Sequence, residues 1–121
     1  MAIKANLIID QGSDFSATVD VLDSSDQPFN LGGYTTRGQM RKNYATATVT
    51  AQFITTHNSD GGVITLSLPN SDVVDGTTVT QVGTNSIEPG RYLYDVEIVS
   101  SNNTVTRVVQ GTVTVTGGVT R

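Results

Sequence analysis

Apolar and polar residues alternate along most of this chain, in runs that are rich in Thr and Val. The clearest run spans residues 90–99, where Tyr92, Tyr94, Val96 and Ile98 lie on one side. The same period of two recurs at residues 3–9, 15–21, 34–41, 49–56, 63–68 and 104–116. Because successive side chains of a strand point to opposite faces, this period predicts half-buried β-strands, which β-branched residues also favour.

Clusters of Gly, Asn, Asp and Ser separate the runs and predict turns, for example at residues 10–13, 57–62 and 100–103. Short strands at this spacing, with no helical pattern between them, are typical of an all-β fold. We therefore expect an immunoglobulin-like antiparallel β-sandwich of about seven to eight strands, with residues 1–121 as a single domain.

Two details of the strand pattern lead to more specific expectations. Tyr92 follows a Pro–Gly turn at the start of the clearest strand, as in the tyrosine corner of immunoglobulin-like domains. We expect Tyr92 and Tyr94 to be corner and core residues. The alternation of the last strand is interrupted at Arg107 and Gly111, which predicts a β-bulge there.

Residues 69–89 show no firm period, and a segment of this length without regular structure often marks a functional loop. Asn70 or Ser71 could cap one helical turn over residues 72–74. Alternatively, part of the segment forms a short strand.

We expect an irregular arm at about residues 75–88, rich in Thr, Gly and Asn. Apolar residues in such a polar arm often cover another surface. Val79, Val82 and Ile87 are therefore candidate partner contacts, and the alternative is that the arm folds onto its own sandwich.

Composition and charge narrow the classes of function. With no Cys and one His, the chain has no disulfide framework, no thiolate zinc site, no cysteine nucleophile and no site with two or three His ligands. Eleven acidic against seven basic residues give a net charge of −4, opposite to the basic footprint of nucleic-acid binding. The apolar run at residues 7–9 is too short for a signal peptide or a membrane span. We expect no nucleic acid or membrane partner, and folding in the cytoplasm.

Candidate catalytic and ligand-binding chemistry is weak. His57 lies near Ser59 and Asp60, but a Ser–His–Asp triad is defined by geometry and not by proximity in sequence. The Asp-rich loops lack the regular ligand spacing of a calcium site, and no Gly-rich phosphate loop is present. Tyr44 is the one aromatic ring expected to be exposed for stacking on a glycan. We expect no enzyme activity, no cofactor and no metal; a hydrolase around His57 is a formal alternative.

A polar face is predicted where charged residues alternate with apolar ones. Arg37, Gln39 and Arg41 share one face of their strand, and Asp95 and Glu97 share one face of theirs. In an immunoglobulin-like order these strands are neighbours, which would set opposite charges across the ladder. The plainer interpretation is a solvated charged face. In the sharper one, Arg37, Gln39 and Arg41 are contacts for another protein.

Several segments resemble the small β-sandwich virion proteins and domains of tailed bacteriophages, which include marine-phage structural proteins and the amino-terminal domain of baseplate upper proteins. The resemblance covers most of the chain through short motifs at residues 9–15 (IDQGSDF), 31–41 (LGGYTTRGQMR), 90–96 (GRYLYDV) and 108–115 (VVQGTVTV). The chain departs from the family pattern over residues 75–88, where the arm replaces a compact helical turn.

The resemblance implies a non-enzymatic structural protein of the virion, made in the host cytoplasm, that docks on a baseplate, tail or head surface. Its partners would be other virion proteins, recognised as a rigid surface or by strand addition at an exposed sheet edge. Symmetric virion sites also favour a homo-oligomer. The alternative function is a glycan- or surface-binding adhesion module, which the sandwich and the Asn-, Asp- and Thr-rich loops would also suit.

Overall fold

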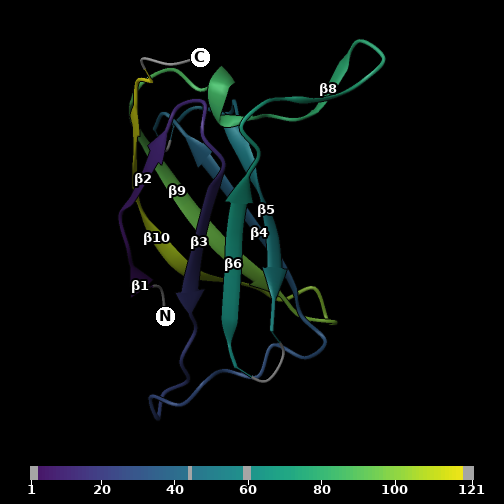
Figure 1. Ribbon diagram of the computed structural model, residues 1–121. Coiled ribbons are helices and arrows are strands. Elements are labelled where there is room, and N and C mark those ends of the chain that lie inside the picture. The colour runs from purple at the N-terminus through teal and green to yellow at the C-terminus, as the bar shows by residue number, and fades with distance from the viewer. Residues whose placement is uncertain (1–2, 44, 59–60, 119–121) are drawn as a thin grey trace.

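The computed structural model describes residues 3–43, 45–58 and 61–118, which form a β-sandwich with a projecting hairpin (Figure 1). One layer contains β1 (Ile3–Lys4), β2 (Leu7–Asp10), β10 (Val105–Thr116), β9 (Gly90–Val99) and β4 (Thr35–Arg41). The other contains β3 (Phe15–Asp20) and β6 (Val63–Leu68), and β5 (Ala51–His57) joins the two. β7 (Val73–Asp75) and β8 (Thr78–Gln81) form the hairpin, and η1 (Thr84–Ser86) is a 3-10 turn. The predicted all-β sandwich is confirmed.

The strand order is that of an immunoglobulin-like sandwich. β9 pairs antiparallel with β10 on one side and with β4 on the other, and β3 pairs antiparallel with β6. β1 and β2 run parallel to β10 at the edge of their layer. The two halves of β5 pair with different strands, residues 51–53 with β4 and residues 54–57 with β6, so β5 crosses from one layer to the other.

The core lies between the layers and is built from the inward positions of the alternating strands. The rings of Phe15 and Tyr94 flank Phe53, at centroid distances of 6.0 and 6.1 Å. Branched aliphatic side chains fill the rest, including Ile9, Leu31, Ile64, Leu66, Val96, Ile98, Val109 and Val113. Burial of these side chains is the main source of stability, at about 1.5–3 kcal/mol for each large one.

The first strand, expected to be continuous over residues 3–9, is interrupted at Ala5 and Asn6. The Ala5 carbonyl accepts a hydrogen bond from the Tyr94 hydroxyl at 2.6 Å, and the Asn6 side chain accepts one from the Thr112 amide at 3.2 Å. A Cβ on Gly111 would lie 2.0 Å from the Ala5 oxygen. Gly111 therefore admits the close approach of the first strand to β10.

The bulge expected in the last strand is confirmed at Arg107 and wrong at Gly111. The register of β10 against β9 shifts between Arg107 and Val109, and Gly111 stays in register with Tyr94. The interruption of the pattern at Gly111 has a different cause, which is the approach of Ala5.

The tyrosine corner is confirmed. The Tyr92 hydroxyl donates to the Glu88 carbonyl, four residues upstream, at 2.7 Å, and both Tyr92 and Tyr94 are buried. Burial raises the pKa of Tyr94 to about 12, and burial followed by the charge of Glu88 raises the pKa of Tyr92. Both hydroxyls are thus held as neutral donors.

The segment after β6 differs from the expected irregular arm. Residues 73–81 form a two-stranded hairpin, with Asp75 opposite Thr78 across a two-residue turn. Gly76 has a φ of 64°, which suits a tight hairpin turn. The helical turn lies at η1 and not at residues 72–74, because the earlier residues pair with β8. The sequence of the hairpin does not alternate apolar and polar residues, because most of the hairpin is exposed on both faces.

Candidate interaction surfaces

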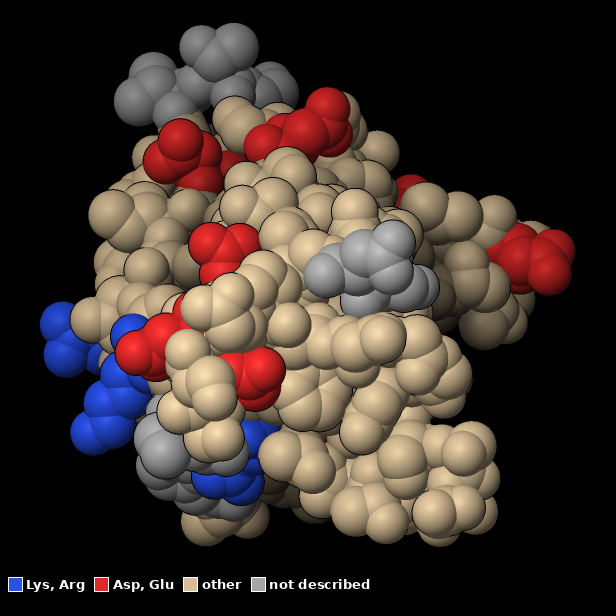
Figure 2. Space-filling view, turned by 90° about the horizontal axis from the view of Figure 1, so that it is seen from below, with Lys and Arg blue, Asp and Glu red and all other residues tan. Residues whose placement is uncertain are grey.

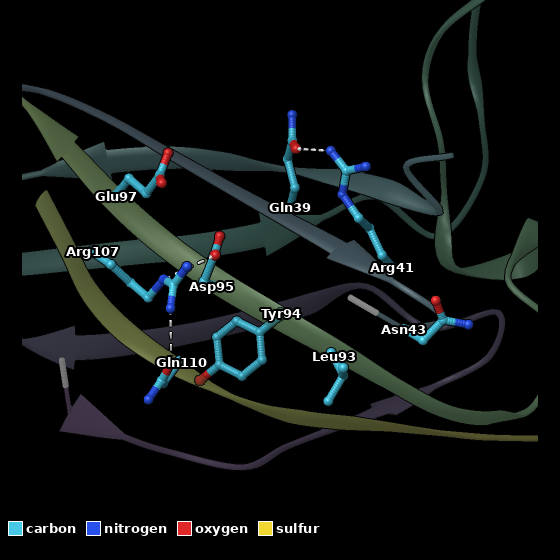
Figure 3. Close-up of a pocket in the computed structure, with 9 residues that line it drawn as sticks. All are labelled: Gln39, Arg41, Asn43, Leu93, Tyr94, Asp95, Glu97, Arg107 and Gln110. Atoms are coloured by element: carbon cyan, nitrogen blue, oxygen red, sulfur yellow. Dashed lines mark hydrogen bonds and ion pairs between the residues drawn. The ribbon is translucent and has the colours of Figure 1, made fainter. Parts of the chain in front are cut away.

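The outer face of β4, β9 and β10 carries the predicted ladder of opposite charges. Arg37 lies opposite Glu97 and Gln39 lies opposite Asp95 in the register of β4 and β9, as expected. Arg37 Nε is 2.8 Å from Glu97 Oε1. From the other side, Arg107 Nε is 3.2 Å from Asp95 Oδ2 (Figure 3). Such exposed pairs contribute only about 0.2–1 kcal/mol each, so they order the face more than they stabilise the fold.

Arg41, a predicted partner contact, also makes hydrogen bonds within the chain. Its guanidinium donates to the carbonyls of Thr46 and Ala47, at 3.1 and 2.7 Å, and to the Gln39 side chain at 3.1 Å. These bonds hold the loop that follows β4 against the sheet. Arg41 therefore shapes one end of the face, and its guanidinium is already engaged within the chain.

The face is hollowed between these side chains (Figure 3). The depression has a volume of about 320 Å³ and is lined by Gln39, Arg41, Asn43, Leu93, Tyr94, Asp95, Glu97, Arg107 and Gln110. Burial, reinforced by the neighbouring Glu97 carboxylate, raises the pKa of Asp95; Arg107, Arg41 and Arg37 act in the opposite direction. The hollow offers amide, guanidinium and carboxylate groups around one apolar side chain, Leu93.

Charge is strongly segregated between this layer and the rest of the molecule. Every Lys and Arg in the described ranges lies on β1, β4, β9 or β10, or directly after β4: Lys4, Arg37, Arg41, Lys42, Arg91 and Arg107. The same strands and β2 carry three carboxylates, Asp10, Asp95 and Glu97. Elsewhere in the described chain the charged side chains are all acidic: Asp14, Asp20, Asp23, Asp26, Asp72, Asp75 and Glu88. In Figure 2 the blue residues accordingly gather on one side of the molecule, while red residues are more widely spread.

The β7–β8 hairpin spans residues 73–81, and from here on the word arm means these residues alone. It extends away from the sandwich (Figure 1). Val74 pairs with Val79 across the two strands, so these side chains share one face of the arm. They are 54% and 47% exposed, and Val73 is 50% exposed. Three valines left half in water on one small hairpin form an apolar surface available for a partner.

The base of the arm is fixed to the sandwich by polar contacts. The Gln81 side chain donates to the Gln52 carbonyl of β5 at 2.7 Å, and the Asp72 carboxylate accepts from the Gly83 amide at 2.7 Å. A Cβ on Gly83 would lie 2.2 Å from the carbonyl carbon of Ser71, so only glycine permits the two stems to approach this closely. The arm thus leaves the body in a defined direction.

The three apolar residues predicted as partner contacts differ in how far they are exposed to solvent. Val79 is exposed on the arm, Val82 is partly buried and packs against the core, and Ile87 is 1% exposed within the core. The placement of Ile87 among the exposed contacts is corrected, because η1 turns the chain back onto the sandwich. Val74, which the sequence pattern did not single out, is exposed on the arm. The Asp75–Gly76 pair was the available signal for the hairpin.

The residues considered for catalysis or ligand binding are only partly placed. His57 ends β5 and is exposed, whereas Ser59, Asp60 and Tyr44 lie outside the described residues. Within the described ranges, no three His, Asp or Glu side chains gather in a way that could hold a metal ion. The described residues also contain no helix that is long and apolar enough to cross a membrane.

Comparisons with known proteins add little to this geometry. No family model matches the chain, and no curated protein matches it. Among solved structures, the chain is similar to a family 123 glycoside hydrolase from Clostridium perfringens, described for glycolipid glycan hydrolysis, at 9% identity and a TM-score of 0.38. The similarity covers 98% of this chain and 24% of that one, so the chain spans about a quarter of that protein's length. A likeness this distant carries no argument about function.

Proposed function

We propose that this chain is a non-enzymatic structural protein of a tailed-bacteriophage particle and acts by docking on other virion proteins. The arm is the observation that carries the proposal. A hairpin that leaves the body in a fixed direction, with Val73, Val74 and Val79 half exposed, is suited to recognition by another protein.

Two further features support docking. The sequence motifs that resemble small virion sandwich proteins cover parts of β2, β4, β9 and β10 in one layer and reach the first residue of β3 in the other. On that layer the ion pairs of Arg37 and Arg107 and the hydrogen bonds of Arg41 pre-order the exposed side chains. A pre-ordered surface loses less side-chain entropy when a partner binds.

Mass spectrometry of gradient-purified particles tests this function. Peptides of the chain should be present at a constant ratio to the major particle proteins across independent preparations. A host cytoplasmic protein of similar abundance serves as the control for contamination and should vary between preparations. If the chain is expressed during infection but absent from particles, the proposal is wrong.

A second candidate function, glycan binding, is favoured by the polar hollow beside Leu93. Its lining combines hydrogen-bond donors and acceptors from Gln39, Gln110 and Asn43, the kinds of group that bind sugar hydroxyls. A glycan array with and without calcium distinguishes this candidate from docking: reproducible binding that Gln110→Ala removes would favour it, and no signal on any glycan would count against it.

A further inference from the structure

We propose that the chain assembles head to tail with copies of itself, the arm of one copy docking on the outer face of β4, β9 and β10 of the next. The inference rests on the proposed function in taking the arm as a recognition element. It goes further by naming the partner and the surface that the arm contacts.

The arm needs a partner for a physical reason. A two-stranded hairpin is marginally stable in water unless a third strand or another surface covers it. Here the contacts of Gln81 and Asp72 fix the base of the arm, while the Val74–Val79 pair farther along remains half exposed. Covering that pair would remove apolar surface from water and would order the hairpin.

Charge selects the place on a second copy where the arm can dock. The charged residues of the arm and its base are acidic, Asp75 near the turn and Asp72 at the stem. On the described chain, cations occur only on strands β1, β10, β9 and β4 and directly after β4, where six Lys and Arg occur together with two carboxylates, Asp95 and Glu97. All other described charges are acidic and would repel the arm. The cationic face is therefore the one electrostatically favourable docking surface that the described residues of a second copy offer.

The shape and chemistry of this face also suit the arm. The hollow of about 320 Å³ has half-buried Leu93 in its lining, between Arg41 and Arg107 (Figure 3). The aliphatic stems of arginines provide apolar area while their guanidinium groups stay in water. Val74 and Val79 can pack on Leu93 and these stems, with Asp75 near the exposed Arg91, which shares the outer face of β9 with Leu93.

The two surfaces differ, so the contact is heterologous and leaves one arm and one face unused in every pair. Assembly then continues until a ring closes or a filament forms. This separates the proposal from an arm-to-arm dimer, in which identical surfaces meet and assembly stops at two copies.

Two variants, each altering one surface, test the inference. Val74→Ser with Val79→Ser alters the arm, and Arg91→Glu alters the face while leaving the Arg37–Glu97 and Arg107–Asp95 ion pairs in place. Asp20→Lys, at an exposed position of β3 in the other layer, is the matched control for a change of charge. Urea unfolding shows whether each variant keeps the stability of the wild-type chain.

Size-exclusion chromatography with light scattering gives the result. The wild-type chain and Asp20→Lys should elute with masses of at least twice 12.8 kDa, and the arm and face variants should each be monomeric. When the two monomeric variants are mixed, the intact arm of one docks on the intact face of the other. A 1:1 dimer, twice the monomer mass, should form and should weaken as salt is added.

Three outcomes overturn the inference: a monomeric wild-type chain at its highest soluble concentration, a face variant that still assembles, or a mixture that stays monomeric. A face variant that assembles alone would indicate arm-to-arm contact. A wild-type chain that is monomeric but present in particles would overturn self-assembly and leave docking on other virion proteins intact.

Discussion

The arm and the turn that follows it are neighbours in sequence and similar in composition, yet apolar residues of the arm are exposed and those of the turn are largely buried. In the arm, residues 73–81, three valines remain half exposed. In the turn, residues 82–87, Thr84 and Ile87 are almost completely buried.

The difference arises from the backbone and side-chain partners that each stretch finds. The Thr84 amide donates to the Pro69 carbonyl, and its hydroxyl donates to the Ser13 carbonyl at 2.7 Å and accepts from the Gly12 amide at 3.1 Å. This cluster, called the clasp below, ties the turn to the connection between β2 and β3. Local composition therefore does not decide which apolar residues serve the core and which remain available to a partner.

The largest difference in the free energy of unfolding is expected between the variants Ile87→Ala and Val79→Ala. Ile87 is 1% exposed, and its truncation leaves a cavity in the core, so the free energy of unfolding should fall by about 3 kcal/mol. Val79 is 47% exposed, and its truncation should change stability by no more than about 0.5 kcal/mol. Urea titrations measure both values, and equal losses would contradict the assignment of these residues to different regions.

Gly83→Ala and Gly76→Ala test the two glycines that flank β8. An alanine Cβ at Gly83 would collide with the Ser71 backbone, and we expect a loss of about 2–3 kcal/mol. Gly76 has open space around it but a φ of 64°, so Gly76→Ala should cost about 1 kcal/mol. Hydrogen exchange should localise the second effect to the arm; loss of protection across the sandwich on Gly76→Ala would show that the arm folds together with the core.

Thr84→Val tests whether the hydrogen bonds of the clasp or the bulk of its side chain matter. Valine has nearly the same shape but leaves the Ser13 carbonyl and Gly12 amide without this partner, which should cost about 2 kcal/mol. Thr84→Ser keeps the hydroxyl and should lose about 1 kcal/mol. Thermal unfolding ranks the stabilities of the two variants. If Thr84→Val is more stable than Thr84→Ser, packing of the side chain contributes more than its hydrogen bonds.

The smallest effect is expected at Asp95 and depends on pH. Because burial and Glu97 raise the pKa of this carboxyl in the folded chain, the folded state binds the proton more tightly than the unfolded state. The resulting stabilisation is fully present below the unfolded pKa and is lost as pH rises through the folded pKa.

Because Asp95→Asn lacks this contribution, its stability relative to the wild-type chain should increase as pH rises through the folded pKa, measured by urea unfolding at a series of pH values. Asp20→Asn, at the end of β3, serves as the control for loss of one carboxylate. A stability difference from the wild-type chain that instead falls as pH rises would reverse the sign of the expected linkage.

Much of the layer that carries the candidate face could be predicted from the sequence. The alternation around Arg37 and around Tyr92 gives two strands with one apolar and one charged side, and the tyrosine corner identifies their order. Opposite charges across these neighbouring strands follow from that order, and the structure sets the register that pairs Arg37 with Glu97. These features were predictable because a strand that is buried on one face alternates apolar and polar residues along the sequence.

The arm and the clasp could not be predicted in the same way. The arm has no buried face along most of its length, so its strands lack the alternation on which the prediction depends. The engagement of Arg41 with residues 46 and 47 depends on the path of a loop. The role of Gly111 depends on the approach of Ala5, which lies at the other end of the chain.

The sequence by itself determined the all-β class, the inward faces of the main strands and the tyrosine corner. Only the tertiary structure decided that Ile87 enters the core while Val74 and Val79 stay outside, and that the cations gather on one layer. The physical reason is the range of the interactions. Strand alternation is set by adjacent residues, whereas the burial of Ile87 depends on contacts such as that of Thr84 with Ser13, 71 positions apart in the chain.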